Sequence, residues 1–253
     1  MRAIRLTARL IAARLIGTVT HVSTDERVAA LTFDDGPHPE FTPRLLDILE
    51  EHQARATFFC LGKFAQRHPD ILRRMAEARH AIGNHSWDHP SFPLIGSSER
   101  RRQLRACAEA LAPHGQPLFR PPWGNQSYAS RLDALWLGYQ VVTWNVLAED
   151  WLDHDADWLA QRVLGKLGPG SIIVFHDRLA TAQNPRYFDR GPTLEAVEKI
   201  LTKLRGDYRF VTVPELLRVG RAHRENWRQS HAAEWLNARI TEEGLAHRHA
   251  LPR

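Results

Sequence analysis

The chain has few cysteines and no long apolar run. Only Cys60 and Cys107 occur among 253 residues, so a disulfide framework is excluded and we expect two buried thiols. No stretch of 18 or more consecutive apolar residues occurs, so no transmembrane helix is predicted. Hydrophobic residues make up 43% of the chain, which at this length is enough for one sizeable core.

Lysine is also scarce, since arginine supplies 30 of the 34 basic residues. The net charge of +5 and the pI of about 9.6 favour an anionic partner. The basic residues are scattered, however, and do not interleave with aromatic residues as an RNA-binding sheet requires. We therefore expect no nucleic-acid partner, and no pattern indicates an oligomeric state.

Residues 1–19 contain no acidic residue and form an N-terminal amphipathic segment. On a helical projection Arg2, Arg5 and Arg9 form one stripe opposite isoleucine and leucine side chains. Arginines also interrupt what would be the apolar core of a secretion signal, so we expect a cytoplasmic protein. A helix packed on the domain is the favoured interpretation, while a transit peptide and peripheral membrane association remain alternatives.

From about residue 20 the chain alternates short apolar runs with amphipathic stretches. Strands are expected at 28–33, 56–60, 81–84, 117–119, 140–144, 171–175 and 209–213. Helices are expected at 42–52, 63–79, 97–112, 127–137, 156–167 and 192–205. This alternation predicts an α/β fold with about seven parallel strands, either a distorted (β/α) barrel, which we favour, or an open doubly wound sheet.

The expected organisation is one catalytic domain with a helical extension at each end. The domain covers residues 20–216, between the N-terminal segment 1–19 and a polar C-terminal extension at 217–253 that is expected to be helical. In either architecture, the residues that carry chemistry gather at the carboxyl ends of the strands.

Two adjacent carboxylates, Asp34 and Asp35, end the first of these strands and are followed by Gly36. Within a strand they would point to opposite faces, but a turn at Gly36 would let both reach one pocket. Two ionised carboxylates this close repel each other unless a cation neutralises one of them. The pair therefore favours a metal site over a solvated turn.

Two histidines follow the third expected strand. His85 and His89 lie four residues apart, so a single helical turn ended by Pro90 would place both imidazoles on one face. Since this pair and the Asp pair both lie at carboxyl ends of strands, they form a candidate Asp/His/His metal site.

Five ordered motifs carry a resemblance to a known family. TFDDGP at 32–37, HSWDH at 85–89, RPPWG at 120–124, DW at 150–151 and VFHD at 174–177 resemble the motifs of the polysaccharide deacetylase family. That family is also called the nodulation-protein-B (NodB) homology domain or carbohydrate esterase family 4. The resemblance covers about residues 20–216 and implies a distorted (β/α) barrel.

The resemblance implies roles for five polar residues. Asp35, His85 and His89 would bind a divalent metal, most readily zinc, although cobalt or iron would suit the same donors. Asp34 would be the general base that deprotonates the attacking water, and Arg120 would orient Asp34.

The resemblance also implies how the leaving group and the acetyl group are handled. His176 would be the general acid that protonates the departing amine. The backbone N–H of Trp123 would stabilise the oxyanion, and Trp151 and Val174 would line a small pocket for the acetyl methyl group.

One position departs from the family pattern. The family usually has an Asp three residues before the Asp-Trp pair, and Leu147 stands there in this chain. The resemblance implies that this carboxylate supports the acid histidine, so we expect weakened tuning of His176 unless Asp150 takes over.

Together these residues predict a metal-dependent hydrolase that removes N-acetyl groups from amino sugars of a glycan or glycoconjugate and releases acetate. Two alternatives stay open. One is a non-haem iron oxygenase, because two histidines and a carboxylate are also that class's ligands. The other is a carbohydrate-binding pseudoenzyme, which only Leu147 favours.

Overall fold

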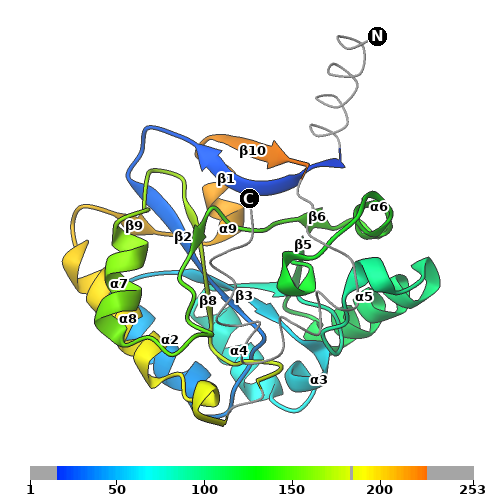
Figure 1. The fold of residues 1–253 in the computed structure, drawn as a ribbon, viewed down its shortest axis with the longest axis horizontal. Helices are drawn as coiled ribbons and strands as arrows, with labels where there is room; N and C mark the ends of the chain where they lie inside the picture. Colours follow the sequence, from blue (N-terminus) through cyan, green and yellow to red (C-terminus); the bar gives the residue numbers. More distant parts are fainter. Residues whose placement is uncertain (1–15, 183–184, 227–253) are drawn as a thin grey trace.

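The computed structural model describes residues 16–182 and 185–226 (Figure 1). The strands are β1 Thr18–Ser23, β2 Val28–Asp34, β3 Ala56–Cys60, β4 Ala81–Asn84, β5 Gly115–Phe119, β6 Gln140–Val141, β7 Val146–Leu147, β8 Ile172–His176, β9 Arg209–Phe210 and β10 Arg221–Glu225. The α-helices are α2 Phe41–Glu51, α3 Gly62–Ala65, α4 Pro69–Glu77, α5 Ser97–Leu111, α6 Tyr128–Trp136, α7 Ala156–Leu164, α8 Gly191–Lys203 and α9 Val213–Leu216. Short 3-10 turns cover Phe92–Leu94, Pro122–Gly124 and Pro185–Phe188.

The main sheet is a curled half-barrel of parallel strands. Its order is β6-β5-β4-β3-β2-β8-β7, and β9 pairs with the start of β2. Every pairing in this sheet is parallel, and the helices that connect most of the strands pack on the outside (Figure 1). The predicted distorted barrel of about seven parallel strands is confirmed, and the open doubly wound sheet is not formed.

A second, two-stranded sheet joins the two ends of the described chain. Strand β1 pairs antiparallel with β10, and it also bridges the main sheet at Val142 and Ser171. Thr18 and Val19 therefore lie in a strand rather than in the amphipathic segment. Arg221–Glu225 likewise form β10, so the expectation of a wholly helical C-terminal extension is wrong. Residues 1–15 and 227–253 lie outside the described residues.

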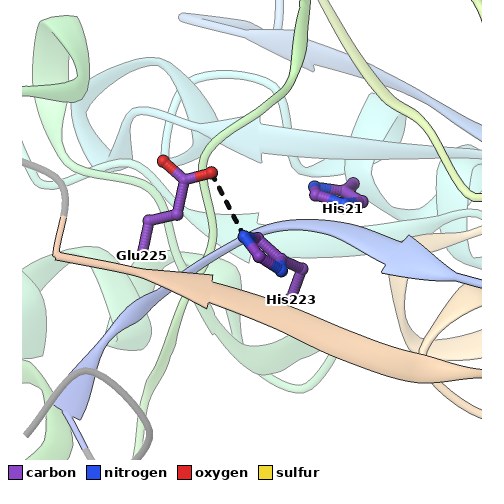
Figure 2. A group of neighbouring side chains, drawn as sticks. All are labelled: His21, His223 and Glu225. Carbon is purple, nitrogen blue, oxygen red and sulfur yellow. Dashed lines mark ion pairs between the residues drawn. The ribbon is translucent and has the colours of Figure 1, made fainter. Parts of the chain in front are cut away.

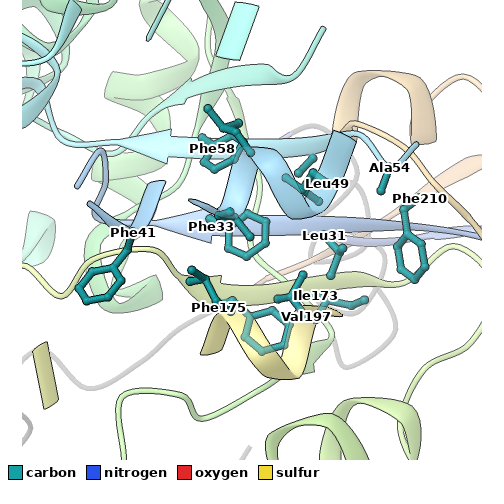
Figure 3. Close-up of a cluster of buried hydrophobic side chains, with 14 of the residues drawn as sticks. Leu31, Phe33, Phe41, Leu49, Ala54, Phe58, Ile173, Phe175, Val197 and Phe210 are labelled. Atoms are coloured by element: carbon teal, nitrogen blue, oxygen red, sulfur yellow. The ribbon is translucent and has the colours of Figure 1, made fainter. Parts of the chain in front are cut away.

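The two faces of β2 build two separate apolar clusters. Leu31 and Phe33 pack toward the outer helices in the cluster of Figure 3, which includes Phe58 and Phe175. The alternate residues Val28 and Ala30 belong to a second cluster on the opposite face. Because side chains alternate along a strand, the next residues on that second face are Thr32 and Asp34. The same alternation that buries the strand thus directs Asp34 toward the inner face of the half-barrel.

Helices largely follow the sequence-based expectations. The stretch expected as one helix at 63–79 is two helices, because Pro69 occupies the first turn of α4 and begins a new one. Within the described ranges, none of the helices has the length and apolar character needed to cross a membrane. Both Cys60 and Cys107 are buried free thiols, as predicted.

Candidate active site

Asp34 and His176 lie side by side at the carboxyl ends of the two central strands. They are Cα partners in the parallel pairing of β2 with β8. Both strands are buried along most of their length, so the two polar side chains emerge where the apolar part of each strand stops. This register brings two residues 142 positions apart in the sequence to one edge of the sheet.

Three buried donor atoms converge beside this pair. Oδ1 of Asp35 lies 3.3 Å from Nε2 of His85 and 3.2 Å from Nε2 of His89. Three donors bound about 2.0–2.2 Å from one tetrahedral ion would be separated by about 3.4 Å, which is close to the observed spacing. Oδ2 of Asp35 accepts a hydrogen bond from the Ala180 N–H at 2.8 Å, whereas buried Oδ1 has no hydrogen-bond partner among the described residues. The donor set therefore fits a divalent metal.

Left-handed backbone conformations bring these ligands together. Asp35 has φ 72°, Ser86 has φ 75° and His89 has φ 73°, values that non-glycine residues rarely adopt. The positive φ at Asp35 turns its carboxylate out of the strand alternation, so that it joins Asp34 at one site. The segment His85–Pro90 is an irregular loop, so the single helical turn expected there is wrong, although the two imidazoles do meet.

Neighbouring groups fix the orientation of both imidazoles. Nδ1 of His85 lies 2.7 Å from the carbonyl oxygen of Arg120, so the ring donates there and presents Nε2 to Asp35. The ring of His89 meets the indole of Trp123 edge-on, with centroids 4.1 Å apart. Trp123 itself has φ 54°.

Burial and neighbouring groups favour the metal-binding forms of Asp35 and His89. Burial tends to raise the pKa of Asp35, but His89 and His85 hold it well below its usual value. Burial also lowers the pKa of His89, although Asp35 acts in the opposite direction. An ionised carboxylate and a neutral imidazole are the forms that bind a cation.

Arg120 holds the other carboxylate, Asp34. The fully buried guanidinium donates from Nη1 to Asp34 Oδ1 at 2.8 Å and to the Thr32 hydroxyl at 2.6 Å. Nη2 donates to the carbonyl of Thr143, and the ring of Phe59 lies 4.1 Å from the guanidinium carbon. Burial lowers the pKa of Arg120 while Asp34 acts to raise it, and a guanidinium stays charged across ordinary pH. The predicted contact of Arg120 with Asp34 is therefore present.

Asp150 holds the ring of His176. Its Oδ1 lies 2.9 Å from Nδ1 of His176, and its Oδ2 accepts the backbone N–H of His176 at 2.8 Å. Burial tends to lower the pKa of His176, but Asp150 raises it, and the net direction is upward. Leu147 pairs with Val174 in the strand ladder, and Asp150 supplies the carboxylate partner of His176, which is the alternative that the sequence left open.

Sequence reasoning missed two residues that hold Asp150 in turn. Arg190 lies 3.6 Å from Asp150 Oδ2 and donates to its carbonyl oxygen at 2.7 Å, while the Thr193 hydroxyl donates to Oδ2 at 3.2 Å. Burial tends to raise the pKa of Asp150, but His176 and Arg190 keep it below its usual value. No motif distinguishes Arg190 among 30 arginines, so the sequence offered no signal for it.

A further carboxylate, Asp177, lies fully buried beneath the site. Burial raises its pKa to about 7, and the Thr42 hydroxyl donates to it. A Cβ at Gly36 would lie 2.7 Å from Cγ of Asp177, so only glycine fits where the chain passes this side chain. Glycine is therefore required at position 36 because a side chain would not fit. Its backbone conformation is not the reason, because its φ is outside the left-handed region.

The remaining predicted residues flank His176. The indole of Trp151 is nearly buried and lies perpendicular to the His176 ring, with centroids 5.5 Å apart. Val174 is buried on β8 two residues before His176, and therefore on the same face of the strand.

A carboxylate and two imidazoles that fit a metal, flanked by one held carboxylate and one held imidazole, define a metal-dependent hydrolase. The chain belongs to the polysaccharide deacetylase family. The family model for polysaccharide deacetylase matches residues 21–142. The enzyme is thus a hydrolase that removes N-acetyl groups from amino sugars of glycans.

Similar proteins support this assignment. The chain is 36% identical over 196 residues to a peptidoglycan-N-acetylglucosamine deacetylase of Bacillus cereus, covering 76% of this chain and 69% of that protein. It is 37% identical over 168 residues to a chitooligosaccharide deacetylase of Sinorhizobium fredii, covering 63% and 76%. The crystal structure of the Bc1960 peptidoglycan N-acetylglucosamine deacetylase superposes with a TM-score of 0.72 at 33% identity, covering 81% of this chain and 94% of that one. Neither the oxygenase nor the pseudoenzyme alternative is favoured by these relatives.

Proposed function

We propose that this enzyme removes the acetyl group from N-acetylglucosamine residues of peptidoglycan, with zinc as the metal. The substrate is suggested by the similar Bacillus cereus protein and by the Bc1960 structure. The observation that carries the proposal is the convergence of the Asp35, His85 and His89 donors between an Arg120-held Asp34 and an Asp150-held His176.

Asp35, His85 and His89 would hold the zinc ion. Bound there, zinc would supply a Lewis acid that lowers the pKa of a coordinated water to about 7 and polarises the substrate carbonyl. Because Oδ2 of Asp35 accepts the Ala180 N–H, Oδ1 would be the carboxylate oxygen available to the metal. Nitrogen and oxygen donors in this number suit zinc, while cobalt and iron are also compatible with them.

Asp34 would accept the proton of the attacking water. Arg120 donates a hydrogen bond to its Oδ1, which orients the carboxylate. Because the guanidinium is fixed by Thr32 and Thr143 as well, Asp34 needs no rearrangement before the reaction.

His176 would donate a proton to the departing amine through Nε2. Asp150 fixes the tautomer by bonding Nδ1 and stabilises the imidazolium, so the ring holds a proton to a higher pH than an unpaired histidine at the same depth. An amine is a poor leaving group until it is protonated, which is why the acid is needed.

The oxyanion and the acetyl methyl group would be handled by neighbouring residues. The backbone N–H of Trp123 would stabilise negative charge on the carbonyl oxygen, and Trp151 with Val174 would line the acetyl pocket.

Acetate release with and without metal tests the mechanism. Chelation should abolish release from an N-acetylated glycan, and zinc should restore it. The variant His85→Ala should lose metal and activity together. Asp34→Asn should keep the metal while its rate falls on the order of 10²–10⁴, the usual scale for a general base. Full activity in the metal-free protein, or loss of metal in Asp34→Asn, would contradict the assignment.

A substrate panel tests the proposed glycan separately. Peptidoglycan fragments should release acetate faster than chitooligosaccharides of matched length. If chitooligosaccharides react faster, peptidoglycan is not the preferred substrate, but the deacetylase activity is supported. If neither reacts in the zinc- or cobalt-loaded enzyme, the function is wrong.

A further inference from the structure

The β1–β10 sheet carries a second group of metal-ligating side chains, outside the active site. His21 lies on β1, and His223 and Glu225 lie on β10 (Figure 2). One ligand atom from each of the three lies within 4.8 Å of the other two. None of these residues takes part in the deacetylase site described above.

The strand pairing explains this proximity. His21 and His223 are direct Cα partners across the antiparallel pair, so their side chains emerge on the same face. Glu225 lies two residues beyond His223 and therefore shares that face. A register shift between Val19 and His21 makes Thr20 an extra residue on β1. This bulge lets the Thr20 side chain reach His21 and Glu225.

Contacts within the group leave ligand atoms available. The imidazoles of His21 and His223 are stacked, with centroids 4.4 Å apart and planes 27° apart. Nε2 of His223 lies 3.4 Å from Oε1 of Glu225, the ion pair drawn in Figure 2. The Thr20 hydroxyl lies 3.1 Å from Nδ1 of His21 and 3.4 Å from Oε1 of Glu225. Thr20 thus orients the His21 ring through Nδ1 and leaves Nε2 as the metal-binding atom.

We propose that His21, His223 and Glu225 form a peripheral zinc site. Two imidazole nitrogens and one carboxylate oxygen are a common donor set for zinc, with water as the fourth ligand. The spacing of His223 and Glu225 already matches the separation of about 3.4 Å between donors on a tetrahedral ion. These two side chains are 47% and 49% exposed, so both can rotate to close the remaining distance to His21.

The local charges agree with this geometry. Glu225 lies beside the two imidazoles, so its carboxylate would offset part of the charge of a cation bound there.

The site is separate from the catalytic centre and does not depend on the proposed function. His21 forms an antiparallel bridge with Ser171, which immediately precedes β8, whereas His176 is the last residue of that strand. At about 3.3 Å per residue, Ser171 and His176 lie about 16 Å apart along the strand. A metal here would fasten β10 to β1 rather than act on the substrate.

Zinc binding in a background without the catalytic site tests the proposal. The double variant His85→Ala/His89→Ala should still bind about one zinc ion per chain by equilibrium dialysis, through three protein ligands and water. Adding His223→Asn should weaken this binding on the order of tenfold or more, because losing a ligand costs at least as much as losing a group that orients one. Glu225→Gln, on the exposed face of the strand, should weaken it as well.

Matched variants separate this site from other histidines. In the same background His114→Asn, on the half-buried turn before β5, and His247→Asn/His249→Asn should bind zinc as the background does. With copper in place of zinc, the electron paramagnetic resonance spectrum should show two nitrogen ligands, and His21→Asn should remove one. In the otherwise wild-type enzyme, His223→Asn should leave acetate release unchanged.

Three results would overturn the proposal. The first is a background variant that binds no zinc at micromolar concentration. The second is binding that survives both His21→Asn and His223→Asn. The third is binding that disappears with His247→Asn/His249→Asn.

Discussion

Asp150 sets the proton affinity of His176, and this contact yields a prediction at the scale of one residue. Burial alone would lower the pKa of His176, but the Asp150 carboxylate raises it. A general acid works only while protonated, so activity should fall as the pH rises through this raised pKa. Asp150→Asn removes the charge, so the alkaline limb of kcat should move to lower pH by on the order of one unit. A shift of this size corresponds to about 1.4 kcal/mol of interaction between the carboxylate and the protonated ring.

The rate measured against pH for wild type and Asp150→Asn checks this direction. Asp153→Asn is the control, because that carboxyl group is 66% exposed and pairs with Arg186 on the surface. Its profile should match the wild type. An alkaline limb that stays in place in Asp150→Asn would mean that His176 is not the acid or that Asp150 does not set its pKa.

Gly36 passes too close to Asp177 for any side chain. The Cβ of Gly36→Ala would meet the buried Asp177 carboxyl group, so either the loop carrying Asp35 or Asp177 must move. We expect a loss of about 1–3 kcal/mol in the free energy of unfolding, measured by urea denaturation.

Gly168→Ala is a matched control, because Gly168 also precedes a proline and a Cβ there would contact nothing within 4 Å. Its unfolding free energy should stay within about 0.5 kcal/mol of wild type. Equal unfolding free energies for Gly36→Ala and Gly168→Ala would show that Asp177 or the loop carrying Asp35 can move at no cost in stability.

At the scale of single elements, β2 is stabilised from both faces. Leu31 is fully buried in the outer cluster of Figure 3. Leu31→Ala should cost about 2–5 kcal/mol in unfolding free energy, because the cavity it leaves lies between strand and helices. Leu132→Ala on α6 makes the same chemical change at a side chain that is 52% exposed, and it should cost less than about 0.5 kcal/mol. Urea denaturation of both variants measures the difference, and equal losses would contradict this account of the core.

Elements with strong patterns could be predicted from the sequence. The strands β2, β3, β4 and β8 lie within one residue of their expected bounds, because buried apolar runs are unambiguous there. Strand β7 has only two residues, and β10 has a single apolar residue, Ala222, so neither carries a hydrophobic period. Their pairing depends on partners far along the chain, which local patterns do not encode.

The candidate site was predictable as a set of residues but not as a geometry. Motifs pointed to the three candidate metal ligands and to Asp34, Arg120 and His176, which the structure brings together. The left-handed backbone at Asp35 and His89 has no local signature, because non-glycine residues adopt it only when the surrounding structure imposes it. The contact of Asp150 with His176 depends on how the loop after β7 packs, so the sequence could name Asp150 only as an alternative to a carboxylate at position 147.

At the scale of the whole molecule, we propose peripheral membrane association through the N-terminal arginines. Arg2, Arg5 and Arg9 would each add about 1 kcal/mol of attraction to anionic lipid. Replacing all three with glutamine should weaken binding to phosphatidylserine vesicles in a sedimentation assay, without changing turnover of a soluble substrate.

A control with the same charge change separates a local effect from net charge. Arg67, Arg73 and Arg79 are exposed on and around α4, and their replacement by glutamine should leave vesicle binding as in the wild type. Equal binding by the wild type and the N-terminal variant would favour a helix packed on the domain.

The β1–β10 sheet connects remote parts of the chain, since Arg224 donates to the carbonyl of Gly17, 207 residues away. Contacts this distant in sequence cost the most loop-closure entropy, and β10 alternates between exposed and half-buried residues. We expect this strand pair to open in the native state without the half-barrel opening. Amide hydrogen exchange should therefore release the β10 amides well before those of β2 and β8, and simultaneous exchange would indicate one cooperative unit. Strands β1 and β10 could then separate while the half-barrel strands that carry the catalytic residues stay folded.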